Sequence, residues 1–148
     1  MPTPVPTQPG RRRNAPAPSY DQTLERIRYD GAYPTRERAE QVTRTVLAAL
    51  AAQLGGDLRA ELAAQLPAEA ARPLHCAAPA AQPLTGWGFV QDVAARSGTS
   101  PAVARWDTGA VLGAVAALAD PGLLTRILDE LPSGYALLFG RAELVQAA

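Results

Sequence analysis

The chain has 148 residues, and its 14 basic and 14 acidic residues give a formal net charge of zero. Apolar residues make up 47% and aromatic residues only 5%, so a core has to be built from Ala, Leu and Val, which favours closely packed helices over sheet. Every basic residue is arginine, and the lack of lysine excludes a lysine-bearing phosphate loop, a Schiff-base enzyme and a Ser–Lys catalytic pair.

Residues 1–18 contain six of the 14 prolines and almost no side chain to bury. Such a segment buries too little apolar surface to offset the conformational entropy lost on ordering. We therefore predict a disordered Pro/Arg-rich tail. Its consecutive arginines, Arg11, Arg12 and Arg13, are candidate contacts for the phosphates of a nucleic acid. No apolar run follows them, and none in the chain approaches the roughly 18 residues of a membrane span, so we expect neither a secretory signal nor a membrane partner.

The rest of the chain reads as two similar segments, residues 19–74 and 85–148, which align when the first is shifted by 65 positions. The same shift places Leu66-Pro67 on Leu131-Pro132, and it holds without gaps over roughly fifty residues. We interpret this as an internal duplication. Residues 75–84, which contain two prolines, predict a linker between the copies.

Each copy predicts the same series of helices. Ser19, with Gln22 three residues later, has the spacing of a capping box and begins a short helix. Thr35 and Ser100 are the expected N-caps of a long helix in each copy, and Asp120 is the expected cap of a later one. The predicted buried stripe of the long helix contains Val42, Val46, Leu50 and Leu54 in the first copy, and Val103, Ala110 or Val111, Ala114 or Val115, and Leu118 in the second.

Three aromatic residues of the second copy are assigned to the interior. We expect Trp87 and Phe89 to dock the first helix of this copy, and Trp106 to lie on or beside the buried stripe of its long helix. Gly86 and Gly88 lack the third glycine and the preceding strand that a dinucleotide-binding loop requires.

The sequence therefore predicts an all-α fold, since no stretch alternates apolar and polar residues for long enough to form a strand. We expect two tandem repeats of three to four helices, packed into one bundle with pseudo-twofold symmetry, because each repeat alone buries little apolar surface. The alternative is two separate small units joined by the linker.

Two phrases carry a resemblance to a known family. LAAQLPAEAARPL (Leu62 to Leu74) has its counterpart in ILDELPSGYALLF (Ile127 to Phe139), and a helix precedes each phrase. This resembles the bacterial domain-of-unknown-function family 2267, in which such a unit typically occurs twice. The resemblance implies a helical fold and no known activity. Members usually carry an aromatic and acidic residues in both Leu-Pro segments, whereas the first copy here has alanines and Glu69.

The residues that could carry chemistry are few. His75 and Cys76 are adjacent in the predicted linker, and zinc needs three or four protein ligands, while a nucleophilic cysteine needs a base held by a third group. We therefore expect no catalytic residue, no metal and no cofactor. The single cysteine also fits a reducing compartment, which favours a cytoplasmic protein.

Two functional hypotheses follow. The first is a non-catalytic interaction or scaffold module that binds a protein partner or a second copy through exposed Leu-Pro corners or through the groove between the repeats. The alternative is a weak nucleic-acid-associated protein that uses the basic tail; residues 19–74 carry seven arginines against eight acids, so the basic excess is confined to the tail. The predicted partner-binding residues are Leu131, Pro132, Tyr135, Leu138 and Phe139.

Overall fold

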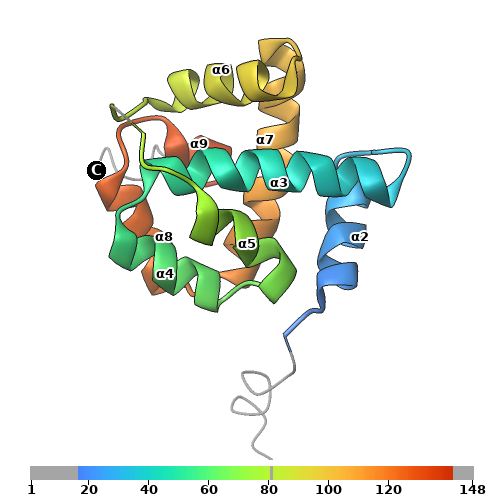
Figure 1. The fold of residues 1–148 in the computed structure, drawn as a ribbon, viewed down its shortest axis with the longest axis horizontal. Helices are drawn as coiled ribbons and strands as arrows, with labels where there is room; N and C mark the ends of the chain where they lie inside the picture. Colours follow the sequence, from blue (N-terminus) through green and yellow to red (C-terminus); the bar gives the residue numbers. More distant parts are fainter. Residues whose placement is uncertain (1–16, 81, 142–148) are drawn as a thin grey trace, which may run out of the picture.

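A computed structural model describes residues 17–80 and 82–141, and within these ranges the chain is entirely helical, without a strand (Figure 1). The all-α prediction is confirmed. Most of the predicted tail, including Arg11, Arg12 and Arg13, lies outside the described residues. The helices of the described part are α2 (Tyr20–Asp30), α3 (Arg36–Gln53), α4 (Gly56–Ala64), α5 (Ala68–Cys76), α6 (Gly86–Ser97), α7 (Pro101–Leu118), α8 (Pro121–Glu130) and α9 (Tyr135–Leu138).

The helices α2, α3, α6, α7 and α8 begin at a polar residue whose side chain caps the helix. At α2 both halves of the capping box are present: the Ser19 hydroxyl accepts from the Gln22 amide at 3.1 Å, and the Gln22 side chain accepts from the Ser19 amide at 2.9 Å. The Thr35 and Ser100 hydroxyls accept from amides three residues further on, at 3.1 and 3.2 Å. Asp120 caps α8 in the same way. Each cap satisfies an amide that has no partner within its own helix.

The long helices α3 and α7 form the centre of the molecule. α3 contacts α2, α5, α6 and α7, while α7 contacts α2, α6 and α9. In Figure 1, α3 crosses the molecule and α7 passes behind it. The buried side chains form one cluster that includes Leu47 and Leu50 of α3, Phe89 of α6 and Leu112 of α7. Two separate units would have separate cores, so this shared core argues against the two-unit alternative.

The helices of the two predicted repeats keep the same spacing in the chain. α3 and α7 both have 18 residues and begin 65 positions apart, and α4 and α8 also begin 65 positions apart. The matched helices contact each other, α3 with α7 and α4 with α8. The twofold symmetry of the bundle stays a prediction. Below, the counterpart of a residue is the one 65 positions away in the other repeat.

The predicted linker begins later than expected. α5 continues through His75 and Cys76, so both residues belong to a helix, with Pro73 inside it. Beyond the helix the chain is tied to the end of α3, because the Ala80 amide donates to the Ala52 carbonyl at 2.9 Å and the Leu84 amide donates to Oε1 of Gln53 at 2.9 Å. Across the ranges that the structure covers, no helix has the length and apolar character needed to span a bilayer.

Candidate protein-interaction surface

The Leu-Pro corner of the second repeat is a part of the core. Leu131, Tyr135, Leu138 and Phe139 are buried, and only Pro132 is partly exposed. The Phe89 and Tyr135 rings pack edge to face with centroids 5.4 Å apart, and the Tyr135 hydroxyl donates to the Leu84 carbonyl at 3.0 Å. The expectation that this corner is exposed for a partner is therefore wrong, because these side chains close the bundle between α6 and α7.

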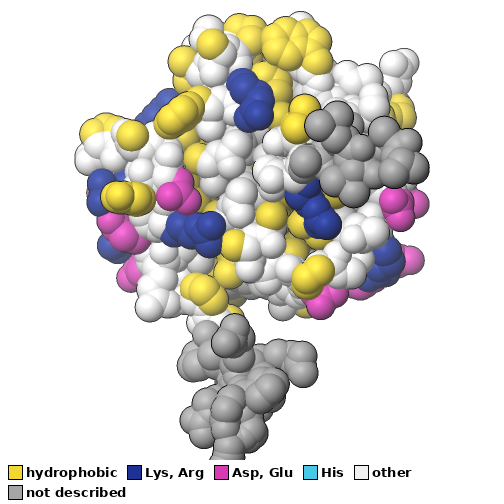
Figure 2. Space-filling view, turned by 180° about the vertical axis from the view of Figure 1, so that it is seen from behind, with side chains coloured by type: hydrophobic (Ala, Val, Ile, Leu, Met, Phe, Trp, Pro, Cys, Tyr) yellow, Lys and Arg dark blue, Asp and Glu magenta, His cyan; other side chains and the backbone are white. Residues whose placement is uncertain are grey.

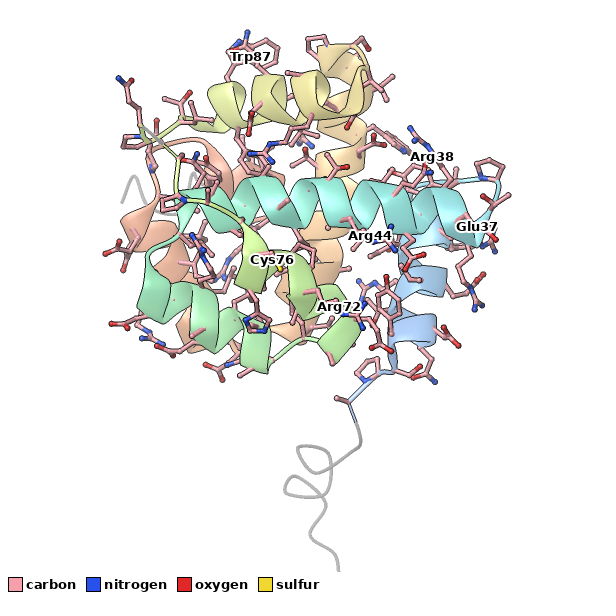
Figure 3. All side chains as sticks on the ribbon, in the orientation of Figure 1. Glu37, Arg38, Arg44, Arg72, Cys76 and Trp87 are labelled. Carbon is pink, nitrogen blue, oxygen red and sulfur yellow. The ribbon has the colours of Figure 1, made fainter. Side chains whose placement is uncertain are left out.

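Two tryptophans expected inside are outside. Trp87 is 59% exposed and Trp106 is 57% exposed, while Phe89 is fully buried as predicted. Figure 3 shows Trp87 projecting from α6 away from the other helices. Val103, assigned to the buried stripe of α7, is exposed as well.

The buried stripe predicted for α7 is confirmed at Val111 and at Ala114 and Val115, and it is wrong at the N-terminal end, where one of the buried residues is charged. The inward residues of α7 are Ala104, Asp107, Thr108, Val111, Leu112, Ala114 and Val115, so the stripe begins one residue later than predicted. Asp107 is only 2% exposed. A pattern of apolar residues alone cannot assign an aspartate to a core position. The pattern therefore predicts burial of Val103 and Trp106 in its place.

Asp107 and Trp106 hold the loop between α2 and α3. Oδ1 of Asp107 accepts a hydrogen bond from the Tyr33 hydroxyl at 2.6 Å, and Nε1 of Trp106 donates to the Gly31 carbonyl at 2.8 Å. Burial, followed by the hydrogen bond to Asp107, raises the pKa of the Tyr33 hydroxyl. Two successive residues of α7 thus fix this loop, and the loop in turn fixes the tryptophan side chain while the residue stays exposed.

The outward side of α7 carries almost no charge. The helix has two charged residues: Asp107 is buried, and Arg105 lies at the edge of the exposed arc. In Figure 2, which views the molecule from behind α3, the acidic side chains lie mainly toward the sides, and arginine side chains are scattered among apolar and uncharged ones over the middle. We call the exposed and half-buried residues of this side the α7 face: Ala102, Val103, Trp106, Gly109, Ala110 and Gly113.

A groove runs along the α7 face where α2 lies beside it. One section, of about 280 Å³, is lined by Trp106, Ala110 and Gly113 of α7 together with Arg26 and Asp30 of α2. Arg26 also lines the next section, of about 340 Å³, which ends at Leu118. Arg26 and Asp30 form an exposed ion pair at 3.4 Å, so the wall from α2 is polar, while α7 contributes Arg105 beside Trp106 and small uncharged residues.

A second hollow lies between α2, α3 and α5. It measures about 250 Å³, and its lining includes Arg44, Arg72 and the exposed Cys76 (Figure 3). The Tyr20 hydroxyl donates to Glu40 at 2.7 Å, and Arg44 pairs with the same carboxylate at 3.1 Å. Burial and the Glu40 hydrogen bond raise the pKa of the Tyr20 hydroxyl. With Glu69 also in the lining, two guanidinium groups face two carboxylates, so this hollow offers no excess charge to select an ionic ligand.

Cys76 and His75 do not belong to a metal site in the part of the chain that the structure covers. No group of three or more His, Cys, Asp or Glu side chains is gathered there as a metal ion would require. The two side chains are the last residues of α5, and both are exposed.

The fold defines a class of protein: a small all-helical bundle built around two matched long helices. A search among curated proteins finds no match to this chain. The chain does match, over residues 20–138, the protein family described as "Uncharacterized conserved protein (DUF2267)", and it belongs to that family. The resemblance predicted from the two Leu-Pro phrases is confirmed.

Proposed function

We propose that this protein is a non-catalytic interaction module whose α7 face binds an apolar helix of a partner protein in the bacterial cytoplasm. One observation carries the proposal: the exposed arc of α7 has a tryptophan, a valine and small residues, with a single charge at its edge. A helix that is apolar on all sides is ordinarily covered on all sides. The inner side of α7 is covered by this chain, so its outer side is suited to a partner.

Trp106 has the properties of a binding anchor. Tryptophan is among the residues that most often dominate binding energy at protein interfaces. The hydrogen bond from its Nε1 to Gly31 holds the ring in place before any partner arrives. Little side-chain entropy is therefore left to lose on binding, which is the effect expected of a preorganised contact.

The shape and charge of the α7 face favour a helical partner with acidic flanks. α7 is about 27 Å long at 1.5 Å per residue, enough for several turns of a second helix. Gly109, Ala110 and Gly113 add little bulk, so a second helix can approach closely, since side chains at the contact set the distance between axes. Arg105 at the edge favours acidic residues beside the apolar ridge of the partner.

Position-specific photo-cross-linking tests the proposal. A photoreactive phenylalanine derivative is placed at Ala110 in the full chain, with the same probe at its counterpart Thr45 on α3 as the matched control; both positions are half-buried. We expect one protein to be cross-linked from Ala110 and not from Thr45. That protein is then identified and purified, and its affinity is measured for the native chain and for Trp106→Gln.

Loss of the anchor is expected to weaken binding about 30-fold or more, the effect of a hot spot of about 2 kcal/mol. Equal cross-linking from both positions, or an affinity unchanged by Trp106→Gln, would contradict the proposal.

A further inference from the structure

The larger section of the groove, of about 340 Å³, lies between one turn of α2 and one turn of α7. It is lined by Pro18, Gln22, Thr23, Arg26, Ala114 and Leu118. Sites for small molecules run from about 300 to 1,000 Å³, so this section has the size of a small one. Trp106 lines the neighbouring section, so the larger section is separate from the anchor of the α7 face.

The hydroxyl of Thr23 is a buried polar group in the wall of this section. Thr23 is 6% exposed, and within the part of the chain that the structure describes its Oγ1 has no hydrogen-bond partner. The hydroxyl of Thr43, which is also buried, donates to the Ala39 carbonyl at 2.7 Å. Because an unpaired buried polar group costs free energy, the Thr23 hydroxyl points to a ligand that pairs with it.

The Thr23 side chain has room to turn toward the groove. Thr23, Ala114 and Leu118 line both the groove section and an internal space of about 10 Å³, so the two share a wall. That space is about the size of one water molecule. Threonine in a helix uses two side-chain rotamers, so rotation about χ1 can bring the hydroxyl to the groove side of the wall.

Arg26 supplies a positive charge at the rim of the same section. Its Nε contacts Oδ2 of Asp30 at 3.4 Å, and both side chains are about half exposed, so this ion pair is weak. Among the described residues the pair uses Nε alone, and the two terminal nitrogens stay available for a second carboxylate. The two sections of the groove together contain Arg26 and Arg105 against the single carboxylate of Asp30, which favours an anion.

We propose that this section binds a small amphipathic carboxylate, such as a carboxylic acid with a medium-length alkyl chain. Thr23 and Arg26 are three residues apart on one face of α2, so a single carboxylate can accept hydrogen bonds from both side chains. The alkyl chain then lies along Ala114 and Leu118 of α7. This inference goes beyond the proposed function and does not depend on it.

Titration of the full chain with octanoate tests the proposal, by calorimetry for affinity and by amide NMR for location. Octanol has the alkyl chain without the charge, and acetate has the charge without the chain. We expect octanoate to bind about ten-fold more tightly than either, and to shift the amide resonances of Thr23, Ala114 and Leu118. Equal affinity for octanol, no binding of octanoate, or shifts confined to other residues would overturn the proposal.

Arg26→Gln tests the charged contact against a matched variant. On α6, Nε of Arg96 contacts Oδ2 of Asp92 at 2.9 Å with the same spacing of four residues, and Arg96 lines neither section of the groove. Arg26→Gln should weaken octanoate binding about ten-fold, and Arg96→Gln should leave it unchanged. Equal effects of the two variants would overturn the proposal, because the net charge of the protein would then explain the binding.

Thr23→Val tests the hydroxyl, and Thr108→Val is its matched control. The Thr108 hydroxyl is also buried without a partner among the described residues, but Thr108 lines neither section. Neither variant should lower the midpoint of urea unfolding, because each removes an unpaired polar group. Thr23→Val alone should weaken octanoate binding several-fold.

Two results with Thr23→Val would contradict the proposed role of this hydroxyl. An unchanged affinity for octanoate would show that the ligand does not use it. A lower unfolding midpoint in the absence of octanoate would show that the hydroxyl already has a partner in the free protein.

Discussion

α3 and α7 occupy matched places in the two repeats and present opposite surfaces. On α3 the outward residues include Glu37, Arg38, Gln41 and Arg44, three of which are labelled in Figure 3. Their counterparts on α7 are Ala102, Val103, Trp106 and Gly109. The same helix length and the same capping chemistry thus support one solvated helix and one helix whose outer side is poorly suited to water.

The inner sides of α3 and α7 also differ, but here α7 is the more polar of the two helices. Val42 of α3 is an ordinary apolar core residue, and its counterpart on α7 is the buried Asp107. On α7 a charged side chain lies inside, where it holds the α2–α3 loop, and apolar side chains lie outside. A duplicated scaffold can therefore keep its helix packing while the surfaces of its two copies diverge.

The largest expected effect comes from Asp107→Ala. The change leaves the Tyr33 hydroxyl without its partner in the interior, which costs about 2–3 kcal/mol of stability. Urea unfolding measures this loss. Tyr33→Phe should cost less, and the double variant should cost less than the sum of the two, because both remove the same bond. Additive losses would show that the pair does not act as a unit.

A rise in pH above 10 should reduce the stability that Tyr33 contributes. The pKa of Tyr33 is raised in the folded protein, so below about pH 10 the hydroxyl is protonated in both states and its contribution is fully present. Above that pH the unfolded chain loses the proton first, and stability falls by up to about 1.4 kcal/mol per pH unit for this group. Urea unfolding at pH 9 and 11 should show a shallower loss for Tyr33→Phe than for the native chain; identical losses would contradict this.

An exchange of surfaces sharpens the comparison with a smaller effect on stability. Val103→Arg with Trp106→Gln gives α7 the residues of α3, and Arg38→Val with Gln41→Trp does the reverse. The first variant should bind an apolar fluorescent dye several-fold less than the native chain and the second should bind more. The second variant should change stability by no more than about 1 kcal/mol, as is usual at exposed positions, and the first should lose about 1 kcal/mol because it removes the bond from Trp106 to Gly31. If neither pair of substitutions changes dye binding, the α7 face does not act as an apolar surface.

The smallest effect is expected from Gly113→Ala, which gives α7 the residue found at its counterpart Ala48. A β-carbon at Gly113 would meet no atom within 4 Å. Replacing glycine within a helix should therefore raise stability by about 0.5–1 kcal/mol, measured by urea unfolding. Gly86→Ala is the contrasting control, because its β-carbon would lie 2.8 Å from the Gly134 carbonyl group and should lower stability. A loss at Gly113 would mean that its helix position is not open.

Much of the fold follows from local signals in the sequence. Ser19 with Gln22, Thr35, Ser100 and Asp120 each begin a helix as predicted, because a cap depends on a few neighbouring residues.

The candidate surface could not be predicted, because it depends on contacts between distant residues. Trp106 is exposed and Asp107 is buried owing to partners 75 and 74 positions away, in the α2–α3 loop. The apolar pattern of α7 is compatible with burial of either side, and only its neighbours decide which side faces inward. One available signal was the near absence of charge on α7, which already indicates a helix without a solvated side.

The two hydrogen bonds from α7 to the α2–α3 loop affect how the protein unfolds. Neither half of the chain contains all the partners that its own turn needs, since the donor and acceptor groups are divided between residues 31–33 and residues 106–107. The halves should therefore melt together, as one cooperative transition with a common midpoint. Fragments 19–74 and 85–148 made separately should each be less ordered than the same residues in the intact chain.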